Sequence, residues 1–313
     1  MDMTKRRVGL LVMAYGSPRN EDEIEAYYTH IRGGRKPTVE MVESLKERYQ
    51  AIGGVSPLSQ ITDLQVEALS KTLNEAQTDI TFVSYLGLKH ASPFIEGAVA
   101  QMHADGIREA VSIVMAPHYS TLSVANYHAR AASYGNGQLT ISGVDSWHIE
   151  EKFIAYWQQA LHEVFSEIPN EEHEQAVVIF SAHSLPERIK HCDDPYEEQV
   201  METAGLIVAQ GKIANYAVCW QSAGKSPEPW LGPDVLDCTR ALHEAKKYKH
   251  FIYAPVGFVA DHLEVLYDND VECRELVEEL GAYYHRAAMP NVDKLFIHGL
   301  ADAVLAKVEE GWI

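Results

Sequence analysis

Acidic residues recur at intervals of three or four in one stretch of the second half of the chain. They follow a short apolar run, 250–256, that ends in proline and glycine signals, and they are Glu264, Asp268, Glu272, Glu275 and Glu279. Side chains at that interval lie on one side of an α-helix. A line of carboxylates suits a divalent cation, or protons that must be handed along, although a charge stripe alone more often marks a solvated face. Its start at a strand-to-helix turn favours a functional site, because open α/β sheets bind ligands there.

Several predicted strands end in polar or glycine-bearing sequences. Tyr15, His90, His118 and His183 follow such strands, as does Glu264. One histidine in such a position is more often structural, but several at equivalent strand ends favour a site. His183 is the strongest candidate, because neutral imidazole binds Fe2+, Co2+, Ni2+ or Zn2+ and accepts a proton near neutral pH. There is no G-x-S-x-G element for a serine nucleophile, and His-Leu-Glu at 262–264 lacks the H-E-x-x-H spacing of a zinc protease.

Cations are concentrated in the segment that follows the first predicted strand. They are Arg32, Arg35, Lys36 and Arg48, and Tyr49 adjoins the last of them. Arginine binds carboxylates through paired hydrogen bonds, and tyrosine can pack against a flat ring. Alone, such a cluster is typical of a basic surface turn. Together with the line of carboxylates that starts at Glu264, however, the cluster indicates a planar, apolar ligand with acidic side groups. Neither G-x-G-x-x-G nor a P-loop occurs, so we expect no nucleotide cofactor.

The composition excludes several classes of protein. The chain has 313 residues, 46% of them apolar, and a net charge of −19, which argues against nucleic acid and anionic membrane surfaces as partners. The longest strongly apolar run, 8–14, is far shorter than the roughly 20 residues of a membrane span. No signal-peptide cleavage site follows it, so we expect a cytoplasmic protein. The four cysteines form no CxxC pair, which predicts reduced, mostly buried thiols.

Short β-branched runs alternate with helical patterns along the whole chain, which is typical of βαβ units. We predict an α/β fold of two similar Rossmann-like domains, each a four-stranded parallel sheet flanked by helices, with a cleft between them. The domains should span 1–149 and 150–313, and the last helix, 292–310, could pack back on the first domain. The expected strands are 8–14, 80–86, 110–116, 139–144, 176–181, 216–220, 250–256 and 282–285, and a helix at 150–167 separates the halves.

The connection between the first two strands is unusually long. It spans about sixty residues, where an ordinary crossover needs far fewer. Three helical patterns fall within it, at 22–31, 39–49 and 62–75. We therefore predict a helical insertion, 17–78, that forms a lid or wall over the cleft.

Seven segments resemble the ferrochelatase family, and within it the short bacterial form that inserts iron into coproporphyrin III. The resemblance covers nearly the whole chain, and its longest, most specific motifs lie at 181–186, 230–234 and 257–264. The other matching segments are 9–16, 27–32, 52–58 and 87–90. The resemblance implies two Rossmann-like domains with the macrocycle in the cleft. It also implies a lyase-class metal chelatase of haem biosynthesis that converts coproporphyrin III to coprohaem.

The resemblance also implies roles for single residues. His183 and Glu264 match the pair at the metal-insertion centre, and Tyr15 matches a tyrosine that can bind iron from the opposite face. Asp268 and Glu272 match the acids of an outer metal site, which could also bind Mg2+. The chain ends without the cysteine-bearing tail of iron–sulfur relatives, so no cluster is expected. Positions that bind the porphyrin are matched by Arg32, Arg48, Tyr49, Ser56, His90 and Tyr127.

Two other functions fit part of the pattern. A non-catalytic tetrapyrrole or haem carrier could use Tyr15 as a ligand, but the line of carboxylates that starts at Glu264 would then have no function. A cobalt chelatase of corrinoid synthesis shares the fold and a histidine–acid centre, but it lacks the tyrosine-rich insertion motifs. The expected partners are a porphyrin and Fe2+, and a downstream coprohaem decarboxylase could make transient contact. We expect a monomer without a transmembrane segment.

Overall fold

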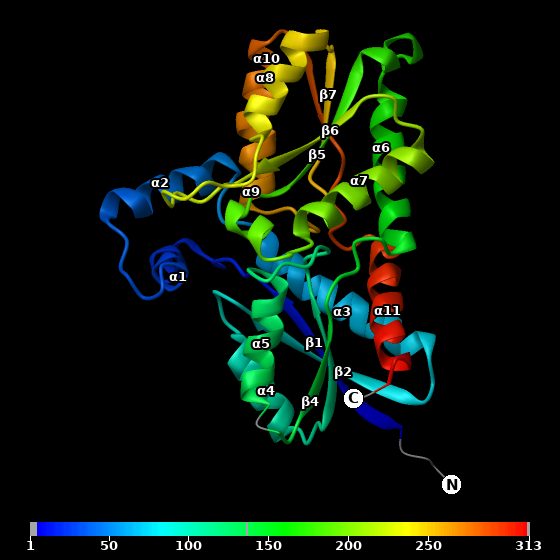
Figure 1. Cartoon of the computed structure of the whole chain (residues 1–313). Helices are drawn as coiled ribbons and strands as arrows, with labels where there is room; N and C mark the ends of the chain where they lie inside the picture. The colour runs from blue at the N-terminus through cyan, green and yellow to red at the C-terminus, as the bar shows by residue number, and fades with distance from the viewer. Residues whose placement is uncertain (1–4, 136, 312–313) are drawn as a thin grey trace. The chain divides into compact units, whose positions relative to one another are not determined.

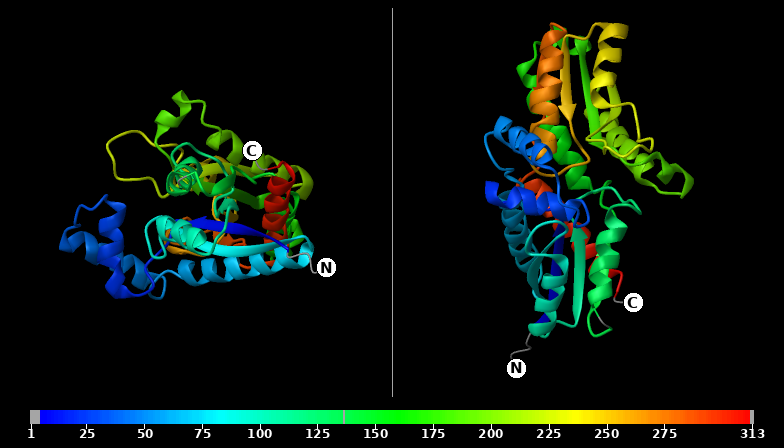
Figure 2. Two further views of the ribbon diagram at one scale, coloured as in Figure 1. Left: turned by 90° about the horizontal axis from the view of Figure 1, so that it is seen from below. Right: turned by 90° about the vertical axis from the view of Figure 1, so that its left-hand side faces the viewer.

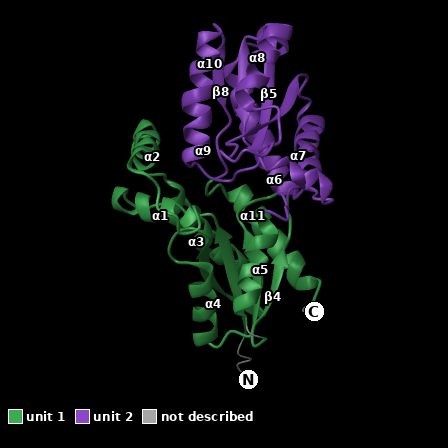
Figure 3. Ribbon diagram, turned by 60° about the vertical axis from the view of Figure 1, so that its left-hand side comes forward, with its two compact units in different colours: residues 1–117, 123–147, 291–313 green, residues 118–122, 148–290 purple. Residues whose placement is uncertain are grey.

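The computed structural model describes residues 5–135 and 137–311 and divides into two compact units (Figures 1 and 3). Unit 1 consists of residues 1–117, 123–147 and 291–313, and unit 2 of residues 118–122 and 148–290. The main boundary therefore lies two residues before the predicted one. The structure places 118–122 in unit 2, whereas the prediction assigned this segment to the first domain. It places 291–313 in unit 1, so the last helix packs back on the first domain, as the prediction allowed. The first segment is held in unit 2 by hydrogen bonds from His118, Tyr119 and Thr121, and the last helix packs on the sheet of unit 1.

Unit 1 is built on a parallel sheet with the strand order β2-β1-β3-β4. The β1 strand is buried from Val8 to Ala14, as expected of an inner strand covered on both faces. Figure 1 shows α4 and α5 on one face of this sheet and α3 and α11 on the other. The strands are β1 (Arg6–Ala14), β2 (Ile80–Leu88), β3 (Glu109–Val114) and β4 (Thr140–Val144). The helices are α3 (Leu58–Ala76), α4 (Ile95–Ala104), α5 (Val124–Tyr134) and α11 (Lys294–Glu309).

Unit 2 repeats this order as β6-β5-β7-β8, also fully parallel. All eight predicted strands and the predicted pair of four-stranded sheets are confirmed. In this unit the strand order reverses between β5 and β7, the kind of position at which open α/β sheets bind ligands. The strands are β5 (Ala176–His183), β6 (Tyr216–Gln221), β7 (His250–Ala254) and β8 (Tyr283–Arg286). The helices are α6 (Glu151–Glu167), α7 (Tyr196–Gly211), α8 (Val235–Lys246), α9 (Leu263–Leu266) and α10 (Arg274–Glu279).

The predicted three-helix insertion is shorter than expected. Two of its helices, α1 (Ile24–Ile31) and α2 (Val39–Ala51), lie beyond the end of the sheet of unit 1. The third, α3, packs along β2 and α11 and is the ordinary crossover helix between β1 and β2 (Figure 2). Its inward side chains include the fully buried Leu69 and Leu73. The prediction that 17–78 forms a single lid was therefore wrong for α3, because its apolar stripe belongs to the core.

The helix predicted after β7 is neither continuous nor regular. It begins only at Leu263, and a π-helical segment, Asp268–Cys273, separates α9 from α10. The Glu272 amide donates to the Tyr267 carbonyl at 3.0 Å, five residues back, so one extra residue enters this turn. The prediction of one uniform acidic stripe was wrong for this reason. Asp268 is buried, with 5% of its surface exposed, whereas Glu272 and the acids of α10 are exposed.

The cysteines differ in part from the prediction. Cys192 is an exposed free thiol and Cys273 a buried one, as reduced thiols would be. Cys219 on β6 and Cys238 on α8 are instead joined by a disulfide bond, so the prediction was wrong for this pair. They meet because α8 packs on β6 and both side chains enter one apolar core cluster. Across the described part of the chain, every helix is too short or too polar to cross a membrane.

Candidate functional site

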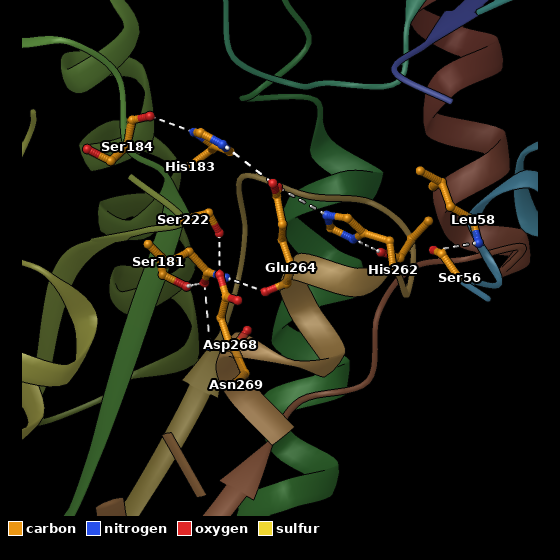
Figure 4. Close-up of polar contacts among 12 residues, drawn as sticks. Ser56, Leu58, Ser181, His183, Ser184, Ser222, His262, Glu264, Asp268 and Asn269 are labelled. Carbon is orange, nitrogen blue, oxygen red and sulfur yellow. Dashed lines mark hydrogen bonds and ion pairs between the residues drawn. The ribbon is translucent and has the colours of Figure 1, made fainter. Parts of the chain in front are cut away.

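The candidate site of unit 2 begins at His183, the last residue of β5. Its Nδ1 lies 2.5 Å from the Ser184 carbonyl oxygen, and the Tyr196 hydroxyl donates to the His183 carbonyl at 2.9 Å. Burial raises the pKa of Tyr196, which keeps the phenol as a donor. We assign the tautomer in which Nδ1–H donates to Ser184, and Nε2 then carries the lone pair. Nε2 lies 3.7 Å from Oε1 of Glu264 on α9, so the two residues of the predicted centre meet (Figure 4).

A second imidazole, from His262, flanks the same carboxylate and was missed by the sequence analysis. Its Nε2 lies 3.7 Å from Oε2 of Glu264, and its Nδ1 lies 2.9 Å from the Ala260 carbonyl oxygen. The Phe258 ring packs against it, with centroids 4.8 Å apart. His262 has extended backbone, with φ −159° and ψ 178°, at the start of α9. The expectation of a continuous helix hid it, because residues two apart in a helix do not face each other.

Gln221, the last residue of β6, connects the elements of this site. Its amide Nε2 donates to the Glu264 carbonyl at 2.8 Å, and its Oε1 accepts from the Ser181 hydroxyl at 2.7 Å. The same oxygen accepts from Nδ2 of Asn269 in the π-helical segment at 3.4 Å. Gln221 is fully buried, so these bonds form in surroundings where an unpaired amide would be costly. They fix α9 and the π-helical segment to the strand that ends in His183 (Figure 4).

The two acids of the predicted outer metal site have different surroundings. Asp268 is buried and accepts a short hydrogen bond from the Ser222 hydroxyl, whose residue has a left-handed φ of +59°. Glu272 is exposed. Within residues 5–135 and 137–311, no group of three or more histidine, cysteine or acidic side chains is arranged to hold a metal ion. The outer metal site therefore stays a prediction.

The candidate group of unit 1 lies where β1 and β2 end. The side chain of Tyr15, just after β1, is 43% exposed, and its ring lies 4.6 Å from that of His90, centroid to centroid. Nδ1 of His90 lies 3.0 Å from Nδ1 of His30 on α1, and the His30 ring stacks on Phe94. Burial, together with the neighbouring Lys89, lowers the pKa of His90 to about 4. His90 is therefore a neutral imidazole at physiological pH.

Tyr127 is one of the enclosed residues among those predicted to bind the porphyrin. It lies on α5 with 5% of its surface exposed, and burial raises its pKa, so the phenol stays protonated. Nζ of Lys89 lies 5.1 Å from the centre of its ring, within the range of a cation–π interaction. Arg130 fixes Lys89 by donating to its carbonyl at 2.9 Å, and it pairs with Glu96. Burial lowers the pKa of Lys89, so desolvation weakens its charged form.

The remaining predicted porphyrin contacts are distributed over the insertion and the loop after it. Arg32 follows α1, donates to the Arg35 carbonyl at 3.2 Å and lies over the ring of Tyr28. Arg48 on α2 is partly buried. Tyr49 and Ser56 are buried, with 3% and 5% of their surfaces exposed, which leaves them little surface for a ligand. Direct contact of these four residues with a porphyrin stays a prediction.

His118, the other histidine at a strand end, has a structural role. It belongs to unit 2, is only 2% exposed, and its Nε2 lies 3.0 Å from the Thr203 hydroxyl oxygen. Burial lowers its pKa well below the usual value, so it is a neutral core imidazole. The alternative that a strand-end histidine is structural therefore holds for His118.

Solved structures with a similar fold are chelatases. The structure of SirB from Bacillus subtilis with Fe3+ aligns with a TM-score of 0.59 and 13% identity, over 98% of both chains. The structure of CbiX, described as the terminal enzyme for biosynthesis of sirohaem in denitrifying bacteria, aligns with a TM-score of 0.55 and 12% identity. It covers 95% of this chain and 98% of that one. At these identities the likeness shows the fold alone.

Closer relatives are found by sequence. A coproporphyrin III ferrochelatase of Geobacillus sp. (strain WCH70) is 57% identical over 309 residues, which is 98% of this chain and 100% of that protein. A coproporphyrin III ferrochelatase of Bacillus subtilis (strain 168) is 56% identical over 308 residues, 98% of this chain and 99% of that protein. The family model for ferrochelatase matches residues 7–308. The chain therefore belongs to the ferrochelatase family.

Proposed function

We propose that this ferrochelatase inserts Fe2+ into coproporphyrin III and yields coprohaem, with His183, His262 and Glu264 at the insertion centre. The observation that carries the proposal is the position of the Glu264 carboxylate, 3.7 Å from Nε2 of each imidazole. The choice of porphyrin rests on the relatives, which are named coproporphyrin III ferrochelatases at 56–57% identity. We also propose that the reaction takes place in the cytoplasm, on the strength of the family alone.

The reaction exchanges two pyrrole protons for one metal ion. Fe2+ must lose water, the porphyrin must release two protons, and four nitrogen lone pairs must face the metal. Both imidazoles donate Nδ1–H to a backbone carbonyl, which leaves two Nε2 lone pairs beside one carboxylate. Each lone pair can accept a proton or bind iron. We assign the proton acceptance to the three residues together, since each Nε2 lies 3.7 Å from the same carboxylate.

The outer acids would act before the insertion step. We propose that Asp268 and Glu272 guide Fe2+ toward the centre, since hard carboxylate oxygens bind Fe2+ moderately and can release it.

Glu272→Ala should raise KM for Fe2+ several-fold and leave kcat within about twofold, because the exposed Glu272 would meet the metal before the chemistry. Glu275→Ala, on the exposed face of α10, is the matched control. An unchanged KM for Fe2+ in Glu272→Ala would remove Glu272 from the metal path.

The function is tested by incubating the purified chain anaerobically with Fe2+ and either coproporphyrin III or protoporphyrin IX. Metal insertion changes the porphyrin absorbance bands, so initial rates follow directly. We expect kcat/KM to be at least about tenfold higher for coproporphyrin III, a difference of roughly 1.4 kcal/mol in transition-state binding. Porphyrin binding without turnover would instead indicate a carrier, and turnover with Co2+ but not Fe2+ a cobalt chelatase.

A further inference from the structure

The segment that carries the insertion centre has little regular structure of its own. Between Asp261 and Asp270 it contains the four-residue helix α9 and the beginning of the π-helical segment. A single helical turn is unstable in isolation, and a π turn is rare and stable only where its surroundings hold it. Contacts from outside the segment must therefore set the positions of His262, Glu264 and Asp268.

Arg286, the last residue of β8, supplies contacts to both ends of this segment. Its Nε and Nη2 donate to the two carboxylate oxygens of Asp270 at 2.8 and 2.9 Å. The same Nη2 donates to Oδ1 of Asp261 at 3.1 Å, and Nη1 donates to the Ala287 carbonyl at 3.3 Å. The side chain is only 15% exposed. One guanidinium thus joins Asp261, which precedes His262, to Asp270, which lies two residues after Asp268.

A second donor completes the surroundings of Asp270. The Tyr284 hydroxyl, also from β8, donates to Oδ1 of Asp270 at 2.7 Å. Burial raises the pKa of Tyr284, so the phenol keeps its proton and the bond keeps its direction. Arg274, in contrast, reaches Asp270 only at 4.0 Å, and its side chain is half exposed. The burial of the guanidinium and its three bonds to carboxylate oxygens distinguish Arg286 from its neighbour Arg274.

We propose that Arg286 is a positioning residue that fixes His262, Glu264 and Asp268 in register with His183 by clamping Asp261 and Asp270. The proposal rests on the function proposed above. A planar guanidinium can hold two carboxylates at once, whereas a lysine ammonium in its place is a single point charge. Loss of the Arg286 guanidinium should therefore loosen the metal-binding segment without unfolding the protein. A misplacement of about 1 Å at reacting groups can cost about 100-fold in rate.

The test uses Arg286→Lys, Arg286→Ala and Asp270→Asn in the full chain, with Arg274→Ala as the matched control. Arg286→Lys retains the positive charge but loses the planar guanidinium that can bind two carboxylates at once. We expect it to raise KM for Fe2+ about fivefold or more and to lower kcat, while the Kd for coproporphyrin III stays within about twofold. Arg286→Ala should exceed Arg286→Lys in both effects, and Asp270→Asn should resemble Arg286→Lys. Arg274→Ala should stay within about twofold of the parent protein in all three constants.

The kinetic pattern separates positioning from general destabilisation. A merely structural role would reduce the folded fraction, so kcat would fall while KM for Fe2+ stayed constant. That pattern in Arg286→Lys, or equal effects in Arg274→Ala, would overturn the proposal. If Arg286→Ala does not fold, Arg286→Lys and Asp270→Asn decide the question. Glu264→Gln is assayed in parallel, because a fully active Glu264→Gln would refute the proposed function, whatever the Arg286 variants do.

Discussion

Replacing His183 by alanine should abolish iron insertion while the protein still binds porphyrin. We expect kcat to fall at least about 100-fold, the lower end of what a positioned acid or base contributes. The imidazole ends β5 with its Nδ1 fixed by Ser184, so its Nε2 is oriented toward Glu264 before any substrate arrives. Removing it takes away a metal ligand and proton acceptor. Porphyrin affinity should stay within about threefold, because the expected macrocycle contacts come mainly from other residues.

Stopped-flow mixing of Fe2+ with porphyrin-loaded protein measures the insertion rate. Quenching of porphyrin fluorescence measures the affinity for the porphyrin. His191→Ala is the matched control, since His191 lies eight residues further on in an exposed turn and should leave both constants unchanged. Retention of more than about a tenth of the parent turnover by His183→Ala would exclude His183 from the insertion centre.

The sheets could be predicted from the sequence because their inner strands, β1 and β5, contain long and mostly apolar runs. In a parallel sheet covered on both faces, inner strands become continuous buried runs rather than alternating ones. The β1 and β5 strands are of this kind, with Val8–Met13 and Val177–Ala182 buried. Once such strands are found, parallel connection places their carboxyl ends at one edge, and the polar residues that follow them become candidates. Tyr15 and His183 were found in this way.

What could not be predicted depends on backbone geometry that side-chain periodicity does not encode. The π turn at 268–273 shifts the phase of the helix by one residue, and sequence spacing alone gives no sign of it. The extended backbone of His262 likewise broke the expected helix and added an imidazole to the site. Long-range packing decided two further cases. The α3 helix covers the sheet of unit 1 as an ordinary crossover helix, and α8 brings Cys238 to Cys219.

Gly257 is the residue whose size most directly controls the geometry of the site. It lies in the turn after β7, and its amide donates to the Ser181 carbonyl at 3.0 Å. A Cβ built at this position would lie 2.4 Å from Cβ and 2.6 Å from Cα of Ala182, far inside van der Waals contact. The obstacle is β5 itself, the strand that ends in His183. Any larger residue must therefore push the turn away from that strand.

Gly257→Ala should both destabilise unit 2 and slow insertion. Overpacking against backbone costs about 1–3 kcal/mol, and displacement of the loop to His262 and Glu264 should lower kcat at least about tenfold. Thermal unfolding and the insertion rate measure the two effects. Gly205→Ala on α7 is the matched control, because its Cβ meets nothing within 4 Å and helix propensity predicts equal or greater stability. A Gly257→Ala protein with the parent Tm and kcat would show that the turn can move without disturbing the imidazoles, so this close approach would not set the site.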